Sequence, residues 1–281
     1  MATQTAVQKE STQSKQMMIF ILVMSLSGLA DLVAEIMPQL ELGPLEISIS
    51  TFWFVPLTLA ILFNNWWAAL AVPIGEIVFS DLLLGEFGGL GEFQEVILVS
   101  VALFIAGWLV RDPRNRRQLI IAGLVAYAIS ELPAAFIDMI TVWVGVEEFE
   151  AVEGLPESVF ALEMIDFLIE YVVTGILVGL LPMLWLLPRL HGKIEPLMGI
   201  KPRTEADRNA TDTPNRMVVY GVVGFVAALL ITLVAASGFN IVEWEAEFLD
   251  SIGAWFIWVA IVITGLVAAA ILYIRSNQAK K

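Results

Sequence analysis

The sequence predicts an all-α polytopic membrane protein with eight transmembrane helices, arranged as a six-helix core and a C-terminal helix pair. Hydrophobic residues make up 58% of the 281 residues, above the roughly 45–50% apolar content of an ordinary soluble domain. The mean hydropathy is +0.82. The apolar residues fall into stretches near the length of about 20 residues that a membrane-crossing helix needs. Basic residues occur only at the two ends of the chain and in every second connection between these stretches.

The predicted elements begin with a polar segment, residues 1–16, which we expect to be a disordered cytoplasmic tail. No A-x-A-like cleavage site follows the first apolar stretch, so we expect a retained helix rather than a signal peptide. Turn residues separate the early spans, as at Gly43-Pro44 and Asn64-Asn65. The eight predicted spans are 17–36, 48–63, 66–84, 95–110, 118–144, 159–188, 216–238 and 252–274.

The charge pattern predicts the orientation of these spans. All 15 Lys and Arg residues lie in the N-terminal tail, in 111–117, in 189–216 or at the C-terminal end. The remaining connections contain acidic residues and no basic residue. The positive-inside rule therefore places both termini in the cytoplasm, and we expect a multi-pass protein of the cell membrane.

The predicted domain organisation follows from the long basic loop after the sixth span. Its parts are a tail (1–16), a six-helix substrate-binding core (17–190), a cytoplasmic linker (191–215) and a helix pair (216–281). The helix pair has no ionisable residue in its predicted core, and small residues recur four apart, as in Gly224 with Ala228. Such spacing suits close helix packing, so we expect a structural role for this pair.

Several function classes lack the residues that they need. The formal charge of −14 argues against a nucleic-acid partner, because phosphate binding needs a basic surface. There is no cysteine, and the single histidine, His191, is expected to be exposed on the linker. Neither a P-loop nor a G-x-S-x-G or H-E-x-x-H motif is present. We therefore expect no catalysis, no cofactor and no metal centre.

Acidic residues nevertheless occur inside spans that hold no basic residue. At about 1.5 Å per residue, Glu76 lies about 16 Å and Glu131 about 21 Å from the inner boundary, and Asp31 is similarly deep. A charged carboxylate at this depth costs about 2.5–3.5 kcal/mol and normally has a partner. Because no basic residue is available, each of these carboxylates must be neutralised by a proton, hydrated in a water-filled cavity or paired with a bound cation. Four more acids are predicted near the outer edge of the core: Glu35, Asp81, Asp138 and Glu170.

Aromatic residues are predicted at the same level as these acids. Trp53, Tyr127 and Tyr171 can box an organic cation through cation–π contacts. The alternative is an interfacial aromatic belt. Pro73 and Pro133 lie close to Glu76 and Glu131 in sequence and free backbone carbonyls. Together these residues predict an oxygen-rich binding cavity in the outer half of the core.

Residues 48–117 also follow a known layout. It consists of an apolar segment with a proline (TFWFVPLTLAILF), a tight turn (NNWW), a helix of small residues with Pro, Gly and acid (AALAVPIGEIVFSDLL), a glycine-rich loop and VALFIAGWLVRDPRNRR. This layout resembles the S component, the substrate-binding membrane subunit, of energy-coupling factor transporters. The added linker and helix pair depart from that family.

The resemblance implies a six-helix core over 17–190 that binds a vitamin or metal ion in its extracellular half. It also implies a transmembrane coupling subunit and two ATPases as partners. An A-x-x-x-A pattern on the first helix contacts the coupling subunit in that family, and Ala30 and Ala34 match it here.

Three function hypotheses remain open at this point. The first is an S-component-like subunit that binds a small cationic or amine-bearing micronutrient, with Glu76 and Glu131 as its deepest ligands. The second is a stand-alone cation- or proton-coupled secondary transporter that uses the same acids. The third is a non-transporting membrane scaffold.

Overall fold

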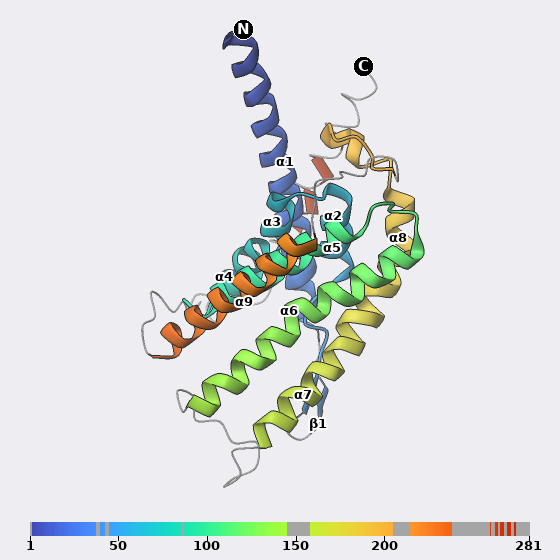
Figure 1. The fold of residues 1–281 in the computed structure, drawn as a ribbon. Helices are drawn as coiled ribbons and strands as arrows, with labels where there is room; N and C mark the ends of the chain where they lie inside the picture. The colour runs from blue at the N-terminus through green and yellow to red at the C-terminus, as the bar shows by residue number, and fades with distance from the viewer. Residues whose placement is uncertain are drawn as a thin grey trace.

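The computed structural model describes residues 2–37, 40–42, 45–85, 87–144, 158–204 and 214–237, with scattered positions between 259 and 273. Figure 1 shows long helices joined by turns and one small hairpin. The α-helices are α1 (Ala2–Glu35), α2 (Phe54–Phe63), α3 (Trp66–Glu76), α4 (Leu82–Leu84), α5 (Glu92–Leu109), α6 (Arg116–Val144), α7 (Ser158–Glu170), α8 (Leu181–Leu190) and α9 (Pro214–Ala236). The other elements are strands β1 (Leu40–Leu42) and β2 (Leu45–Ile47), π-helices η1 (Ile77–Asp81) and η2 (Tyr171–Leu180), and the 3-10 helix η3 (Glu195–Met198).

Six helical stretches in the described part of the chain are long and apolar enough to cross a membrane. They are Gln13–Glu35, Trp66–Leu84, Glu92–Leu109, Arg116–Trp143, Phe160–Leu190 and Val218–Ala235. They match six of the predicted spans, so the described part of the chain is helical as predicted, and its length and apolar composition suit a multi-pass membrane protein. The predicted span 252–274 lies largely outside the described residues. The count of eight, the orientation and the location in the cell membrane stay predictions.

The predicted second span, 48–63, differs from the structure. Only α2 is helical, and its 10 residues reach about 15 Å, half of a bilayer core. The preceding chain forms an antiparallel hairpin in which Leu40 pairs with Ile47. Residues 48–53, called the unwound segment below, then run without regular structure into α2. Non-helical backbone at membrane depth is tolerated where protein or a cavity surrounds it.

The N-terminal tail also differs from the prediction. Residues 2–16, expected to be disordered, are the first part of α1 and continue into the first span without a break. The segment has no Pro or Gly, and Ala, Gln, Lys and Glu favour helix.

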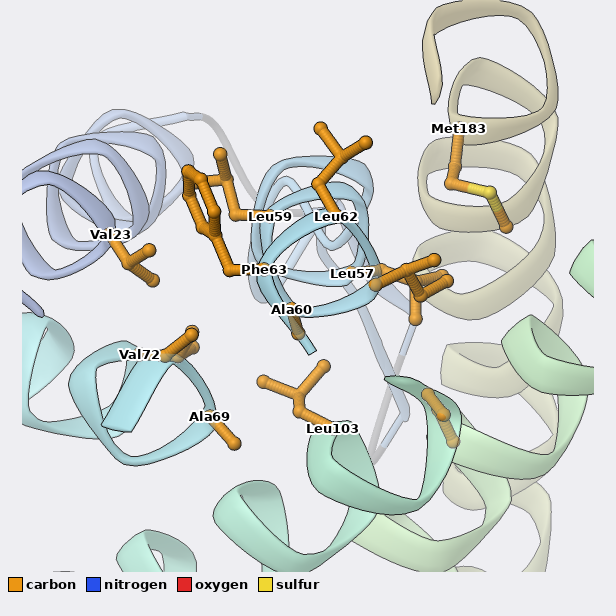
Figure 2. Close-up of a cluster of buried hydrophobic side chains, with 14 of the residues drawn as sticks. Val23, Leu57, Leu59, Ala60, Leu62, Phe63, Ala69, Val72, Leu103 and Met183 are labelled. Carbon is orange, nitrogen blue, oxygen red and sulfur yellow. The ribbon is translucent and has the colours of Figure 1, made fainter. Parts of the chain in front are cut away.

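The core is built around α2. Eight of its ten residues are buried, from Pro56 to Phe63. Figure 2 shows Leu57, Ala60 and Phe63 among side chains of the surrounding helices, with Leu103 of α5 nearby. Asn64 ends α2 in a left-handed conformation with φ of 43°. The short α2 is therefore buried in the middle of the bundle, and the unwound segment leads directly into it.

Helix α9 packs against α5 and α6. A Cβ placed on Gly224 would lie 3.2 Å from Val101 Cγ2. Ala228 is fully buried in a cluster with Leu98 and Ile137. These contacts confirm that Gly224 and Ala228 serve close helix packing.

Candidate functional site

Two glycines bring the predicted deep acids of α1 and α3 together. A Cβ on Gly28 would lie 2.3 Å from the Gly75 carbonyl oxygen, and one on Gly75 would lie 2.3 Å from the Met24 carbonyl oxygen. The two helices therefore touch through their backbones, which only glycine permits. Asp31 lies three residues after Gly28, and Glu76 follows Gly75 directly.

These acids line a small cavity between α1, the unwound segment, α3 and α5. Its volume is about 20 Å³, close to the space that one water molecule needs. None of the nine residues around it is basic. They are Ser27, Asp31, Thr51, Trp53, Pro56, Val72, Glu76, Glu95 and Val99. We call this space the carboxylate cavity.

Glu95 is the third acid of the carboxylate cavity, and the sequence analysis did not select it. It lies in the first turn of α5 and forms a side-chain hydrogen bond with Glu76. Its side chain keeps an exposed surface while it lines the cavity. Glu95 therefore connects the cavity to the surface at the predicted outer end of α5.

Asp31 is held by hydroxyl groups rather than by a basic side chain. It is 5% exposed and forms side-chain hydrogen bonds with Ser80 and with Thr51 of the unwound segment. Asp81 and Glu35, two of the predicted outer acids, add negative charge next to it. The sequence holds no Lys, Arg or His between residues 16 and 110. The negative charge on these helices thus has no counter-ion within the same stretch of chain.

Two buried polar atoms at the carboxylate cavity have no partner among the described residues. They are the Ser27 hydroxyl oxygen and the Trp53 indole nitrogen. Both residues are 3% exposed, and both line the cavity. Because a buried polar group without a hydrogen bond is costly, these atoms indicate a water or ligand in this space.

The other predicted acids form a second acid group, which consists of Glu131, Asp138 and Glu170. Glu131 is partly buried on α6, hydrogen-bonds Ser130, and lies within the electrostatic range of the other two acids. It also interacts with Glu95 of the carboxylate cavity. The two sets of acids are therefore electrostatically continuous.

The predicted aromatic residues connect these two sets. Trp53 contacts Tyr127 edge-on with ring centroids 5.5 Å apart, and Tyr127 contacts Tyr171 at 5.9 Å. The Tyr171 hydroxyl donates to the Leu124 carbonyl oxygen at 3.0 Å. Tyr127 is 2% exposed and hydrogen-bonds Ser50 of the unwound segment. Trp53 and Tyr127 are therefore interior and not part of an interfacial belt, whereas Tyr171 is partly exposed.

Two π-helices adjoin the acids. Helix η1 begins directly after Glu76 and ends at Asp81, and η2 begins directly after Glu170. The wider turn of a π-helix alters which side chains share a face, and such stretches are frequent at functional sites. Pro73, which the sequence analysis singled out, lies inside α3 one turn before η1.

The predicted partner contact on α1 is only partly accessible in this chain. Ala30 keeps some exposed surface, whereas Ala34 is 3% exposed and packs within the chain.

The linker forms a buried polar cluster at the opposite end of the helices, which is the predicted inner end. Arg203 donates to the carbonyl oxygens of Gly107 (2.9 Å), Val110 (2.7 Å) and Ile61. Its guanidinium thereby caps the C-terminal ends of α5 and α2. Burial lowers the pKa of Arg203 to about 10, so it stays protonated near neutral pH.

His191 belongs to the same cluster. It is 8% exposed and lies 2.6 Å from the Glu195 carboxylate. The expectation of an exposed histidine was wrong, because the linker folds back onto the helix ends.

Among the residues that the structure describes, no group of three or more His, Cys, Asp or Glu side chains is arranged to hold a metal ion. The three acids of the carboxylate cavity come from three different helices, and in this conformation they do not converge on one point. What they share is a small space and a surplus of negative charge.

No curated protein and no solved structure matches the chain. A family model matches residues 18–281, which contain both sets of acids and α9. The chain therefore belongs to DUF8171, a family of unknown function.

Proposed function

We propose that this protein is a membrane transporter that binds a positively charged species at the carboxylate cavity, entering from the predicted outer side. The observation that carries this proposal is the meeting of Asp31, Glu76 and Glu95 around one cavity without a basic lining residue. Acids inside spans that face a cavity commonly mark ion pathways and proton relays.

Coulomb repulsion is the physical basis of the selectivity. Two like charges 4 Å apart repel by about 4 kcal/mol at an effective dielectric constant of 20. Glu76 interacts with Glu95, Asp31 and Asp81 at the same time. A species that brings positive charge relieves this repulsion, and an anion adds to it.

The size of the carboxylate cavity favours the proton as the bound species. A volume of about 20 Å³ accommodates a water molecule and no organic solute. A proton shared between the hydrogen-bonded Glu76 and Glu95 needs no space at all. Proton transport by this chain is therefore the function that the geometry supports best.

A second candidate rests on a different observation. Trp53, Tyr127 and Tyr171 contact one another in turn, and Tyr127 interacts with Glu131 and Glu170, a combination that suits an amine-bearing solute. Strand β2 contacts α7 at the outer end, so the hairpin is placed to cover that space. This candidate is the S-component-like subunit, and it requires the unwound segment to move and a coupling subunit to drive uptake.

Proton flux into liposomes tests the first candidate. The purified chain is reconstituted with a pH-sensitive dye inside, and a potassium gradient with valinomycin sets the membrane potential. We expect proton entry above that of empty liposomes, and at least a tenfold loss in Glu76→Gln. Glu163→Gln on α7, which removes an acid that does not line the cavity, is the matched control.

Wild-type flux equal to that of empty liposomes contradicts proton transport by this chain alone. The second candidate is then tested by micronutrient uptake with and without coupling subunits. Uptake that appears only with these subunits supports it.

A further inference from the structure

A second cavity lies between α3, α5 and α9, away from the acids. Its volume is about 540 Å³, within the range of small-molecule sites. All three helices belong to stretches that are long and apolar enough to cross a membrane, so the walls of the cavity lie at the depth of the lipid chains if these helices span it. Apart from Ser100 and the Tyr220 hydroxyl, its lining is apolar. We call it the α5–α9 groove.

The α5–α9 groove has an aromatic end and an aliphatic end. Trp66 contacts Phe104 edge-on at 5.5 Å, and Phe104 contacts Tyr220 at 6.5 Å. Trp66 is the first residue of α3, Tyr220 lies in the second turn of α9, and they are 42% and 48% exposed. At the other end, Gly224 lets α9 approach Val101 and Ile97.

Ser100 is the polar exception inside the α5–α9 groove. Its side chain is 1% exposed, and its hydroxyl oxygen has no hydrogen-bond partner among the described residues. It lies four residues before Phe104, so both side chains share one face of α5. A buried hydroxyl without an acceptor is costly, and an acceptor on a bound molecule would remove that cost.

We propose that the α5–α9 groove binds a membrane-dissolved lipophile with one hydrogen-bond acceptor, such as a carbonyl, on an otherwise apolar body. The Ser100 side chain turns toward the groove so that its hydroxyl donates to the carbonyl, and the apolar body packs between the aromatic end and Gly224. An ordinary acyl chain fits the apolar walls but leaves Ser100 unpaired. This proposal is independent of the proton site.

Photolabelling of the full chain in nanodiscs tests this proposal. The probe is a long-chain methyl ketone with a diazirine, and the labelled peptides are mapped by mass spectrometry. Competitors are an unlabelled ketone and the alkane of the same chain length. We expect labels on α5 and α9, and displacement by the ketone about three- to tenfold better than by the alkane, the ratio for one hydrogen bond.

Variants test separately the hydrogen bond to Ser100 and the volume of the α5–α9 groove. Ser100→Ala should abolish the preference for the ketone, and Ser100→Thr should restore it. Ala227→Trp fills the α5–α9 groove and should abolish labelling. Val226→Trp is the control, because Val226 is 47% exposed on α9 and does not line the groove. Equal displacement by ketone and alkane, or labelling that survives Ala227→Trp, overturns the proposal.

Discussion

The indole of Trp53 contacts the ring of Tyr127 edge-on, with centroids 5.5 Å apart and ring planes at 83°. Trp53 lines the carboxylate cavity, and Tyr127 interacts with Glu131 and Glu170. This ring pair therefore joins the two sets of acids. Because Trp53 belongs to the unwound segment, movement of that segment would alter both sets together.

The close approach of Gly28 and Gly75 should tolerate no side chain. In Gly28→Ala the new Cβ would meet the Gly75 carbonyl oxygen at 2.3 Å. We expect a loss of about 1–3 kcal/mol in unfolding free energy, as for other overpacked sites, and a loss of proton flux as Asp31 and Glu76 separate. Thermal unfolding and liposome flux measure these two effects.

Gly221→Ala is the matched control for that substitution. A Cβ there meets nothing within 4 Å, so stability should rise by up to about 1 kcal/mol through helix propensity. Equal effects of the two substitutions would contradict a special contact at Gly28.

Glu95 should be as important as Glu76, although it was not selected from the sequence. Because the two carboxyl groups share a hydrogen bond, we expect Glu95→Gln and Glu76→Gln each to lower proton flux at least tenfold. The double variant should be little worse than either single one, since both remove the same shared site. Multiplying losses would show that the two acids act separately.

Ser27 should matter for binding rather than for folding. Its hydroxyl has no partner among the described residues, so Ser27→Ala should not lower the unfolding free energy, while proton flux should fall. Thr174→Val is the comparison, because the Thr174 hydroxyl lies 3.1 Å from that of Ser50 and its loss should cost about 1 kcal/mol. A clear drop in the melting temperature of Ser27→Ala would show a structural role.

Arg203 should stabilise the inner end of the bundle. Arg203→Gln leaves three helix-end carbonyls without their charged donor, and we expect a loss on the order of 3 kcal/mol. Arg203→Lys should recover only part of it, because an ammonium lacks the planar fork.

The contribution of Arg203 to the free energy of unfolding should not change with pH over a wide range. Burial lowers its pKa to about 10, so the folded and unfolded chains both carry this proton from about pH 6 to about pH 9. Above about pH 10 the folded chain releases it first, and stability rises with pH relative to Arg203→Gln. A difference in melting temperature that changes between about pH 6 and about pH 9 would contradict this assignment.

Most long helices could be predicted from the sequence, because each needs only a run of apolar residues. The unwound segment, residues 48–53, could not be predicted, because its apolar residues extend the apolar run of α2. The alternation Leu45, Ile47, Ile49 with polar residues between them, after Gly43-Pro44, is typical of a strand. The hydropathy averaged over residues 48–63 predicts a helix instead, because it does not distinguish alternating from continuous apolar residues.

The candidate site was predicted in part for a similar reason. Depth along a helix identified Asp31, Glu76 and Glu131, but not which acids share a cavity. Glu95 was placed at the edge of its span, and only the tertiary contact between α3 and α5 brings it to Glu76. The burial of His191 depends on the linker folding back, which no local pattern encodes.

Infrared spectroscopy of the reconstituted protein tests the carboxylate cavity most directly, because a protonated carboxyl group has its own C=O absorption band. Spectra of the wild type and the Glu76→Gln, Glu95→Gln double variant are compared across the pH range of the flux assay. We expect a carboxyl band that changes with pH in the wild type and is missing from the double variant. Identical spectra from the two proteins would show that no proton binds at these acids.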